Sequence, residues 1–159
     1  MTTYTVSKGK GGVFGAEGLG QCKQRTWFSY DADATLADGR PLAFRRTNWS
    51  RVHLAETPTS SGQAHTIGEF DKTSWLREAG IVRWDGVDHD FGTQSGWKGT
   101  FALSRHGEEL ALIKVSGWKQ DIEITVRDTA TTEPPAGLLL FCAWISLLTV
   151  RDRSGAAAG

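Results

Sequence analysis

The sequence has few of the features that mark secreted, disulfide-rich or nucleic-acid-binding proteins. Its only cysteines, Cys22 and Cys142, are too few for a disulfide framework. The 18 Lys and Arg residues equal the 18 Asp and Glu residues, so no overall field attracts a nucleic acid or an acidic membrane. Residues 1–15 lack the apolar stretch of a secretory signal. We therefore expect a cytoplasmic protein that binds no nucleic acid.

Patterns that would hold a metal ion are missing as well. Leu36 and Leu42 occupy the positions at which a calcium loop beginning at Asp31 needs Gly and Glu. No histidine has the spacing to a second histidine or to a cysteine that zinc sites use. The sequence therefore predicts neither a metal site nor a cofactor.

The sequence does not match the known motifs for phosphate binding or for hydrolysis when each position is compared. The glycine-rich residues 8–15 match neither GxxxxGK[ST] nor GxGxxG. Residues 92–96 are not a GxSxG nucleophile motif. We predict that the protein is not an enzyme, although an active site assembled from scattered acids and histidines stays open.

Most of the chain has the pattern of short β-strands with turn residues between them. In residues 121–126 Ile and Val alternate with polar residues, which is the period of a strand with one buried face. Asp85-Gly86 suits the positive backbone angles of a type I′ turn, and Asp38-Gly39 suggests a further turn. We predict three hairpins, formed by residues 79–84 with 87–91, 100–104 with 109–115, and 25–30 with 41–47.

Two segments of the chain resemble each other. Residues 36–49 and 103–118 share a turn glycine, an apolar strand and a terminal tryptophan. The second segment has one more residue between its glycine and its tryptophan, so an internal repeat would need a bulge or a loop insertion. Chance similarity between two hairpins explains the likeness equally well.

The character of the sequence changes at Pro134-Pro135, where a long apolar run begins. Pro135 suits a helix start, and Arg151 and Arg153 would complement the dipole at the helix end. We predict a helix over residues 136–150. This helix belongs to a single domain that covers residues 1–150, and residues 151–159 form a flexible tail.

The predicted helix has no face suited to water, so protein or lipid must enclose it. A helix of about fifteen residues reaches about 22 Å, which is short of the roughly 30 Å of a bilayer core. A β-barrel is wide enough for a central helix only if it has about eleven or twelve strands. Divided among twelve strands, the residues before Pro135 give about eleven residues for each strand and its turn, which is a usual spacing. We predict a mainly β fold, an antiparallel barrel of about twelve strands, closed or nearly closed, around the helix; a membrane anchor or an oligomer interface are the alternatives.

Four segments carry a resemblance to a known family: SWLREAGIVRWDG (74–86), SGWKG (95–99), GEELALIKVSGW (107–118) and LLLFCAWISLL (138–148). Over residues 65–150 the chain resembles the Tubby C-terminal-like superfamily, in particular its LURP-one-related and phospholipid-scramblase-like branch. The resemblance implies a twelve-stranded barrel around a hydrophobic C-terminal helix. It also implies a role at membranes, because the better-understood members bind phosphoinositide head groups or act there.

The strongest local charge feature is a run of arginines that contains no acidic residue. No acidic residue lies between Arg40 and Leu54, and guanidinium groups bind phosphate through paired hydrogen bonds. A tryptophan within the run could insert at a membrane interface. The predicted anion-binding residues are Arg40, Arg45, Arg46, Trp49 and Arg51, with a solvated strand edge as the alternative reading.

These observations together favour a binding module without catalytic activity. Its predicted ligand is an anionic lipid head group, another small molecule or a protein partner, and its predicted location is the cytoplasm or the periphery of a membrane. The competing hypothesis is a scramblase-like protein whose C-terminal segment inserts into the bilayer.

Overall fold

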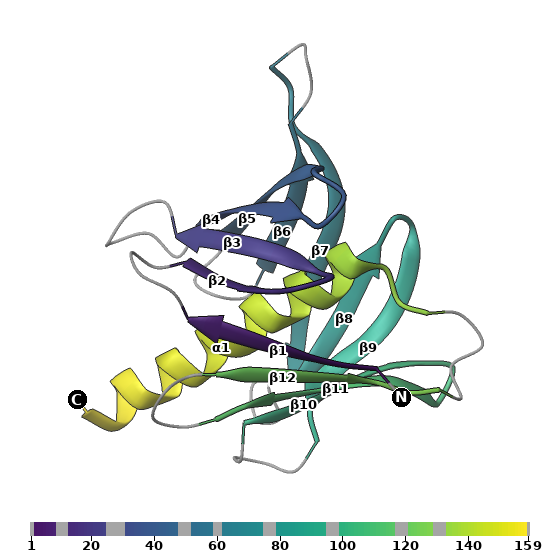
Figure 1. Ribbon diagram of the computed structural model, residues 1–159. Coiled ribbons are helices and arrows are strands. Elements are labelled where there is room, and N and C mark those ends of the chain that lie inside the picture. Colours follow the sequence, from purple (N-terminus) through teal and green to yellow (C-terminus); the bar gives the residue numbers. More distant parts are fainter. Residues whose placement is uncertain are drawn as a thin grey trace.

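The computed structural model describes residues 2–8, 13–24, 31–47, 52–58, 62–74, 79–94, 99–116, 121–128 and 133–158. Within these residues the chain forms twelve β-strands and one α-helix, and the strands close into an antiparallel barrel (Figure 1). The elements are β1 (Thr2–Lys8), β2 (Val13–Ala16), β3 (Gly20–Gln24), β4 (Ala32–Leu36), β5 (Pro41–Thr47), β6 (Val52–Thr57), β7 (His65–Ser74), β8 (Ala79–Trp84), β9 (Val87–Thr93), β10 (Thr100–Arg105), β11 (Glu108–Val115), β12 (Ile122–Val126) and α1 (Ala136–Ala158).

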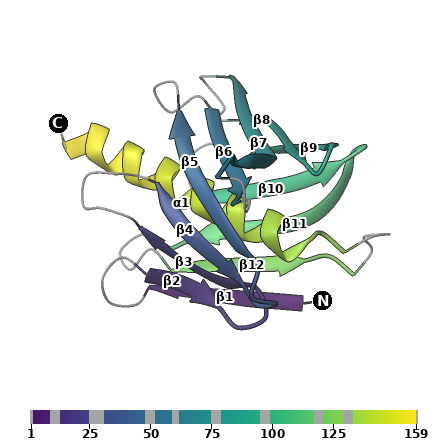
Figure 2. The same ribbon diagram turned by 90° about the horizontal axis from the view of Figure 1, so that it is seen from above.

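The barrel encloses α1, as the apolar run predicts. Figure 2 shows α1 passing through the barrel, with its C-terminal turns extending beyond the strands. Residues 138–148 are all buried. The ring of Phe44 on β5 lies 5.3 Å, centroid to centroid, from both Phe141 and Trp144 of α1. The predicted barrel of about twelve strands around a C-terminal helix is therefore confirmed.

Two of the three predicted hairpins occur as expected. The turn between β8 and β9 has φ of 50° at Asp85 and 79° at Gly86, the positive angles of a type I′ turn. The turn between β10 and β11 has nearly the same angles, 52° at His106 and 78° at Gly107. Both hairpins thus have the turn that matches the twist of barrel strands.

The third hairpin has a different first strand from the one predicted. Its turn does lie at Gly39, whose φ is 89°, but β5 pairs with β4 (Ala32–Leu36), and residues 25–30 lie outside the described residues. In β4 the residues alternate between buried and exposed, starting from a buried Ala32. Alanine and aspartate are poor strand formers, so the pairing of β4 comes from this alternation and not from strand propensity.

A bulge lies in the hairpin that forms the second of the two similar segments. The pairing of β10 with β11 shifts at Leu103/Ser104, so that Leu110 has no partner across the ladder. No such shift interrupts β4 with β5. The second segment therefore contains a bulge, whereas the tryptophans that end the two segments, Trp49 and Trp118, lie outside the described residues and the repeat stays a prediction.

The helix is longer than predicted. It starts at Ala136 as expected but ends at Ala158, not at residue 150, so residues 151–158 continue it and do not form a separate tail. Arg151 is consequently an internal helix residue and not a C-terminal cation. Arginine and alanine favour helix, and no proline follows to stop it. Among the described residues, no helix combines the length and the apolar character needed to cross a membrane.

Candidate functional site

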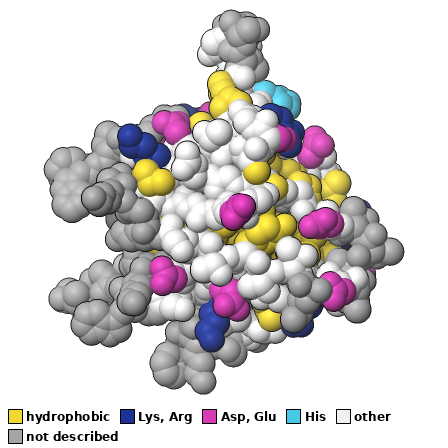
Figure 3. Space-filling model, viewed as in Figure 1, with side chains coloured by type: hydrophobic (Ala, Val, Ile, Leu, Met, Phe, Trp, Pro, Cys, Tyr) yellow, Lys and Arg dark blue, Asp and Glu magenta, His cyan; other side chains and the backbone are white. Residues whose placement is uncertain are grey.

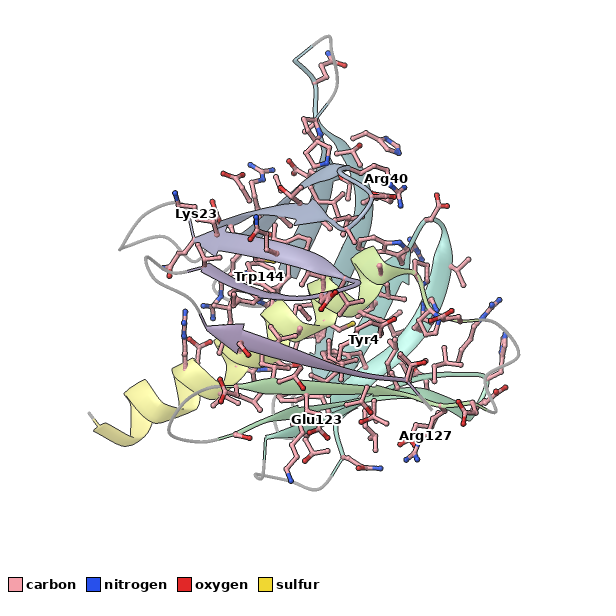
Figure 4. The ribbon with its side chains drawn as sticks, viewed as in Figure 1. Tyr4, Lys23, Arg40, Glu123, Arg127 and Trp144 are labelled. Atoms are coloured by element: carbon pink, nitrogen blue, oxygen red, sulfur yellow. The ribbon has the colours of Figure 1, made fainter. Side chains whose placement is uncertain are left out.

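The predicted anion-binding arginines do not converge on one site. Arg40 precedes β5 while Arg46 lies near its end, a separation of about 20 Å along an extended strand. The Arg45 side chain is partly exposed, whereas the Arg46 side chain is 9% exposed. Figure 4 shows Arg40 on the side of the barrel where α1 begins. Trp49 and Arg51 lie outside the described residues.

Each of the three described arginines pairs with a carboxylate. Arg40 Nε donates to Asp38 at 2.7 Å, and Arg45 Nη2 donates to Glu56 at 2.5 Å. Arg46 pairs with Asp152 of α1. The hydrogen bond that Asp38 accepts from the Arg40 backbone N–H is the main cause that lowers the pKa of Asp38. The charges of these three arginines are therefore paired within the protein.

A pocket of about 450 Å³ opens at the end of the barrel where α1 begins; we call it the mouth pocket. This volume lies in the range of pockets that hold small organic ligands. Figure 3 shows hydrophobic side chains gathered on this face near the start of α1, with Asp and Glu side chains around them. The apolar residues that line the pocket include Leu36, Leu42, Ile67, Trp84, Val87, Leu110 and Pro134.

The position of Trp84 at the mouth pocket is determined by two glycines. A Cβ atom on Gly68 of β7 would lie 2.5 Å from Cε3 of Trp84, and one on Gly137 of α1 would lie 2.6 Å from Cζ2. Real Cβ atoms do not approach so closely, so the ring fits only because both neighbours lack a side chain. The ring also contacts Phe141 at 5.8 Å. Trp84 is therefore a rigid part of the pocket wall.

The start of α1 forms another part of the same wall. The first hydrogen bond at this end runs from the Leu139 N–H to the Pro135 carbonyl, at 3.1 Å. Pro135 therefore occupies the N-cap position, where a Ser, Thr, Asp or Asn side chain would normally accept a bond from the first turn. Proline offers no such acceptor. The first turn also contains no acidic residue.

The polar residues of the mouth pocket carry both signs of charge. His89 is 8% exposed, and its Nδ1 lies 3.2 Å from the Val87 carbonyl. Burial lowers the pKa of His89, and the hydrogen bond to Val87 only partly opposes this shift, so the imidazole is neutral at neutral pH. The other polar residues that line the pocket are Arg40, Thr57, Asp85, Arg105, His106, Glu108 and Glu133.

A second space, about 30 Å³ in volume, lies nearer the other end of α1; we call it the rear cavity. His53 there is 5% exposed, and its Nδ1 has no hydrogen-bond partner in the part of the chain that the structure describes. Burial, and then the charges of Arg46 and Lys72, lower the pKa of His53 to about 3. The residues that line the rear cavity are Arg46, His53, Phe70, Lys72, Phe91, Phe101, Ile145, Thr149 and Asp152.

The two cysteines lie in the core and outside the lining of both spaces. Cys22 and Cys142 are free thiols with no exposed surface. Burial raises the pKa of both thiols well above the usual value, which keeps them protonated and poorly reactive. Within the residues that the structure describes, no three His, Cys, Asp or Glu side chains are grouped so that they could hold a metal ion.

Comparisons with protein-family models, with curated proteins and with solved structures find no match for this chain. The resemblance to the Tubby-like superfamily therefore stays a prediction. The mouth pocket was not predicted from the sequence, because its lining comes from strands far apart in the chain. One signal was readable: Pro134-Pro135 begins an apolar helix without a capping side chain.

Proposed function

We propose that this protein is a non-catalytic binding module that takes a small, largely apolar molecule into the mouth pocket. The observation that carries the proposal is the pocket itself. It has about 450 Å³ of space, an apolar wall that includes the buried Trp84, and polar residues of both signs. This combination is typical of sites that bury a ligand body and orient it through a few polar groups.

The mouth pocket supports ligand binding better than the arginine run does. Arg40, Arg45 and Arg46 already have carboxylate partners, so an anionic head group would have to displace an internal ion pair at each of them. The pocket requires no such displacement. Association with an anionic membrane or with a protein partner stays a further proposal, as does a cytoplasmic location.

The competing scramblase-like function would need residues 138–148 to leave the barrel and enter lipid. Those residues are buried against the inner faces of the strands, and Phe141 alone contacts Phe44, Trp84 and Trp144. Moving them would expose the barrel interior to water and lose its apolar contacts. This cost favours binding by the intact barrel.

The proposal is tested with the fluorescent probe anilinonaphthalene sulfonate and a variant that fills the pocket. Val87 lines the pocket and is half-buried, so Val87→Phe places a larger side chain in the ligand space. Ile81→Phe is the matched control, because Ile81 belongs to the same hairpin but is 42% exposed and lies outside the pocket.

We expect saturable binding of one probe molecule by the native protein. Val87→Phe should weaken it at least about tenfold, which corresponds to about 1.4 kcal/mol. Ile81→Phe should leave the affinity unchanged. Absence of saturable binding, or equal weakening by the two variants, would show that the mouth pocket is not the binding site.

A further inference from the structure

His89 presents a hydrogen-bond acceptor to the mouth pocket. Among the described residues that line the pocket, it is the only polar one that is buried. Its Nδ1 lies 3.2 Å from the Val87 carbonyl, and a carbonyl can only accept, so this bond places the ring hydrogen on Nδ1. A neutral imidazole carries a single hydrogen on its nitrogens, so Nε2 is left as an acceptor.

No donor of the protein uses this acceptor. Within the part of the chain that the structure describes, no side-chain or backbone N–H or O–H donates to Nε2 of His89. The Val82 carbonyl affects the ring less than the Val87 carbonyl does, and as an acceptor it cannot donate to Nε2. Nor is Nε2 enclosed by protein atoms, in contrast to Nδ1 of His53. Because His89 points inward from β9 and lines the pocket, its open nitrogen faces the ligand space.

Two β-bulges shape the apolar wall of the same pocket. The pairing of β6 with β7 shifts at Ala55/Glu56, so Ile67 has no partner across that ladder, just as Leu110 has none across β10 and β11. The carbonyl of Ile67 accepts from the backbone N–H of Asp85 at 2.8 Å, which fixes the bulge. Bulges at barrel rims redirect side chains, and both Ile67 and Leu110 line the mouth pocket.

The charges around the pocket disfavour an ionised ligand group of either sign. An anion would meet the lone pair of His89 and the carboxylate of Glu108, whose Oε1 is buried. A cation would meet Arg105 and the positive end of the α1 dipole. A neutral hydroxyl avoids both repulsions, and it costs less to remove from water than an ammonium group does.

From these features we infer the class of ligand, and the inference rests on the proposed function of the pocket. The mouth pocket takes a neutral molecule with an apolar body and a hydroxyl group, either a phenol or an alcohol, whose O–H donates to Nε2 of His89. The apolar body lies against the wall that Ile67, Leu110 and Trp84 form.

The test compares three probes that have the same number of non-hydrogen atoms. They are para-butylphenol, para-propylanisole, which keeps the oxygen but has no donor, and para-propylbenzylamine, which is a cation. Each displaces bound anilinonaphthalene sulfonate, and the displacement gives its affinity at neutral pH and constant ionic strength. We expect the phenol to bind at least about tenfold more tightly than the anisole and than the amine, because only the phenol is a neutral donor.

One variant removes the acceptor and a matched variant does not. His89→Phe keeps an aromatic ring but has no ring nitrogen. It should lower the ratio of phenol to anisole affinity about fivefold or more while changing the anisole affinity little. The control is His53→Phe, the same substitution at the buried histidine of the rear cavity, which should leave the ratio unchanged.

A second measurement needs no variant, so it holds even if His89→Phe fails to fold. Nitrogen NMR of the histidine rings distinguishes a protonated from a bare ring nitrogen in the native protein. For His89 we expect a protonated Nδ1 and a bare Nε2, and para-butylphenol should shift mainly the Nε2 signal. A hydrogen on Nε2 in the native protein would overturn the inferred class of ligand.

The outcomes separate the ligand class from the proposed function. If anilinonaphthalene sulfonate does not bind, the function of the pocket is refuted and the ligand class with it. If it binds but the anisole or the amine competes as well as the phenol, or none of the three competes, the pocket stands and the inferred ligand class is wrong. A ratio that stays unchanged in His89→Phe, or falls equally in His53→Phe, would show that His89 is not the acceptor.

Discussion

At the mouth pocket α1 begins without a cap beside about 450 Å³ of open space, whereas the rear cavity contains about 30 Å³ between aromatic rings and an ion pair. Phe91 stacks on Phe101 at 5.7 Å there, and His53 meets Trp144 edge-on at 5.4 Å. One end of the barrel therefore has an open pocket beside the start of α1, where Pro135 provides no capping side chain. The other end is filled by packed side chains and ties α1 to β5.

This difference would let one structure combine the proposed binding with stability. Open space inside a protein costs free energy because packing contacts are lost, so it must be offset where packing is complete. The apolar middle of α1 and the rear cavity provide that packing. If this division is right, substitutions in the packed part should lower stability, and substitutions at the mouth pocket should mainly alter binding.

The largest effect is expected inside the barrel, between the two ends. Leu140 has no exposed surface, so Leu140→Asp would place a charge where neither water nor a partner reaches it. The cost of several kcal/mol is comparable to the whole stability of a domain, about 5–15 kcal/mol. We expect no cooperative unfolding transition by circular dichroism. Ile81→Asp, on an exposed site, should fold, and normal folding of Leu140→Asp would contradict an enclosed helix.

The next effect distinguishes the rear cavity from the mouth pocket. Phe101 is 1% exposed and contacts Phe91, so Phe101→Ala should lower the free energy of unfolding by about 3–5 kcal/mol. Val87→Ala, at the mouth pocket, should lower it by less than about 1.5 kcal/mol, because Val87 is half-buried. Urea denaturation measures both values. Equal losses would remove the contrast between the ends.

The features that were predictable from the sequence are those with local causes. The apolar residues 138–148 require an enclosure, and the turns at Asp85-Gly86 and Gly107 determine hairpins through backbone angles. The end of α1 was missed because residues 151–158 contain no strong stop signal. The strand β4 was missed because its alanines show alternation without strand propensity.

The character of the candidate sites was not predictable, because it depends on residues far apart in the chain. No acidic residue lies between Arg40 and Leu54 in the sequence, yet Arg46 pairs with Asp152, which lies 106 positions away. The mouth pocket likewise joins Leu36, Trp84, Leu110 and Gly137 from four separate segments. Only the closure of the barrel brings these residues together.

The protonation of His53 provides a pH-dependent test of the rear cavity. The pKa of His53 falls from 6.5 to about 3 on folding, so between these values the unfolded chain binds a proton that the folded chain does not. His53 therefore costs no stability well above pH 6.5, and its cost grows as the pH falls toward 3, because only the unfolded chain gains the proton. Between pH 6.5 and 5 the loss should be about 2 kcal/mol.

The matched variant for this test is His53→Phe, which keeps an aromatic ring but cannot titrate. It should lose most of the slope of unfolding free energy against pH in the same window, measured by urea denaturation. His89, whose pKa is also lowered, leaves a smaller slope of the same sign in both proteins. An unchanged slope in His53→Phe would mean that the rear cavity is open to water.

The smallest effect concerns the ion pair that ties α1 to the barrel. Asp152→Asn removes the charge opposite Arg46, whose side chain is 9% exposed, and should lower the free energy of unfolding by about 1 kcal/mol. The control is Asp88→Asn, which removes the charge opposite Arg83. Both of these side chains are well exposed, so water and salt already screen the pair. We therefore expect no measurable change in the free energy of unfolding. Added salt should reduce the effect of Asp152→Asn only slightly, because the buried guanidinium is poorly screened. If the two variants instead behave alike, the contact between Arg46 and Asp152 is an ordinary surface pair, and the rear cavity stabilises the protein through its aromatic rings alone.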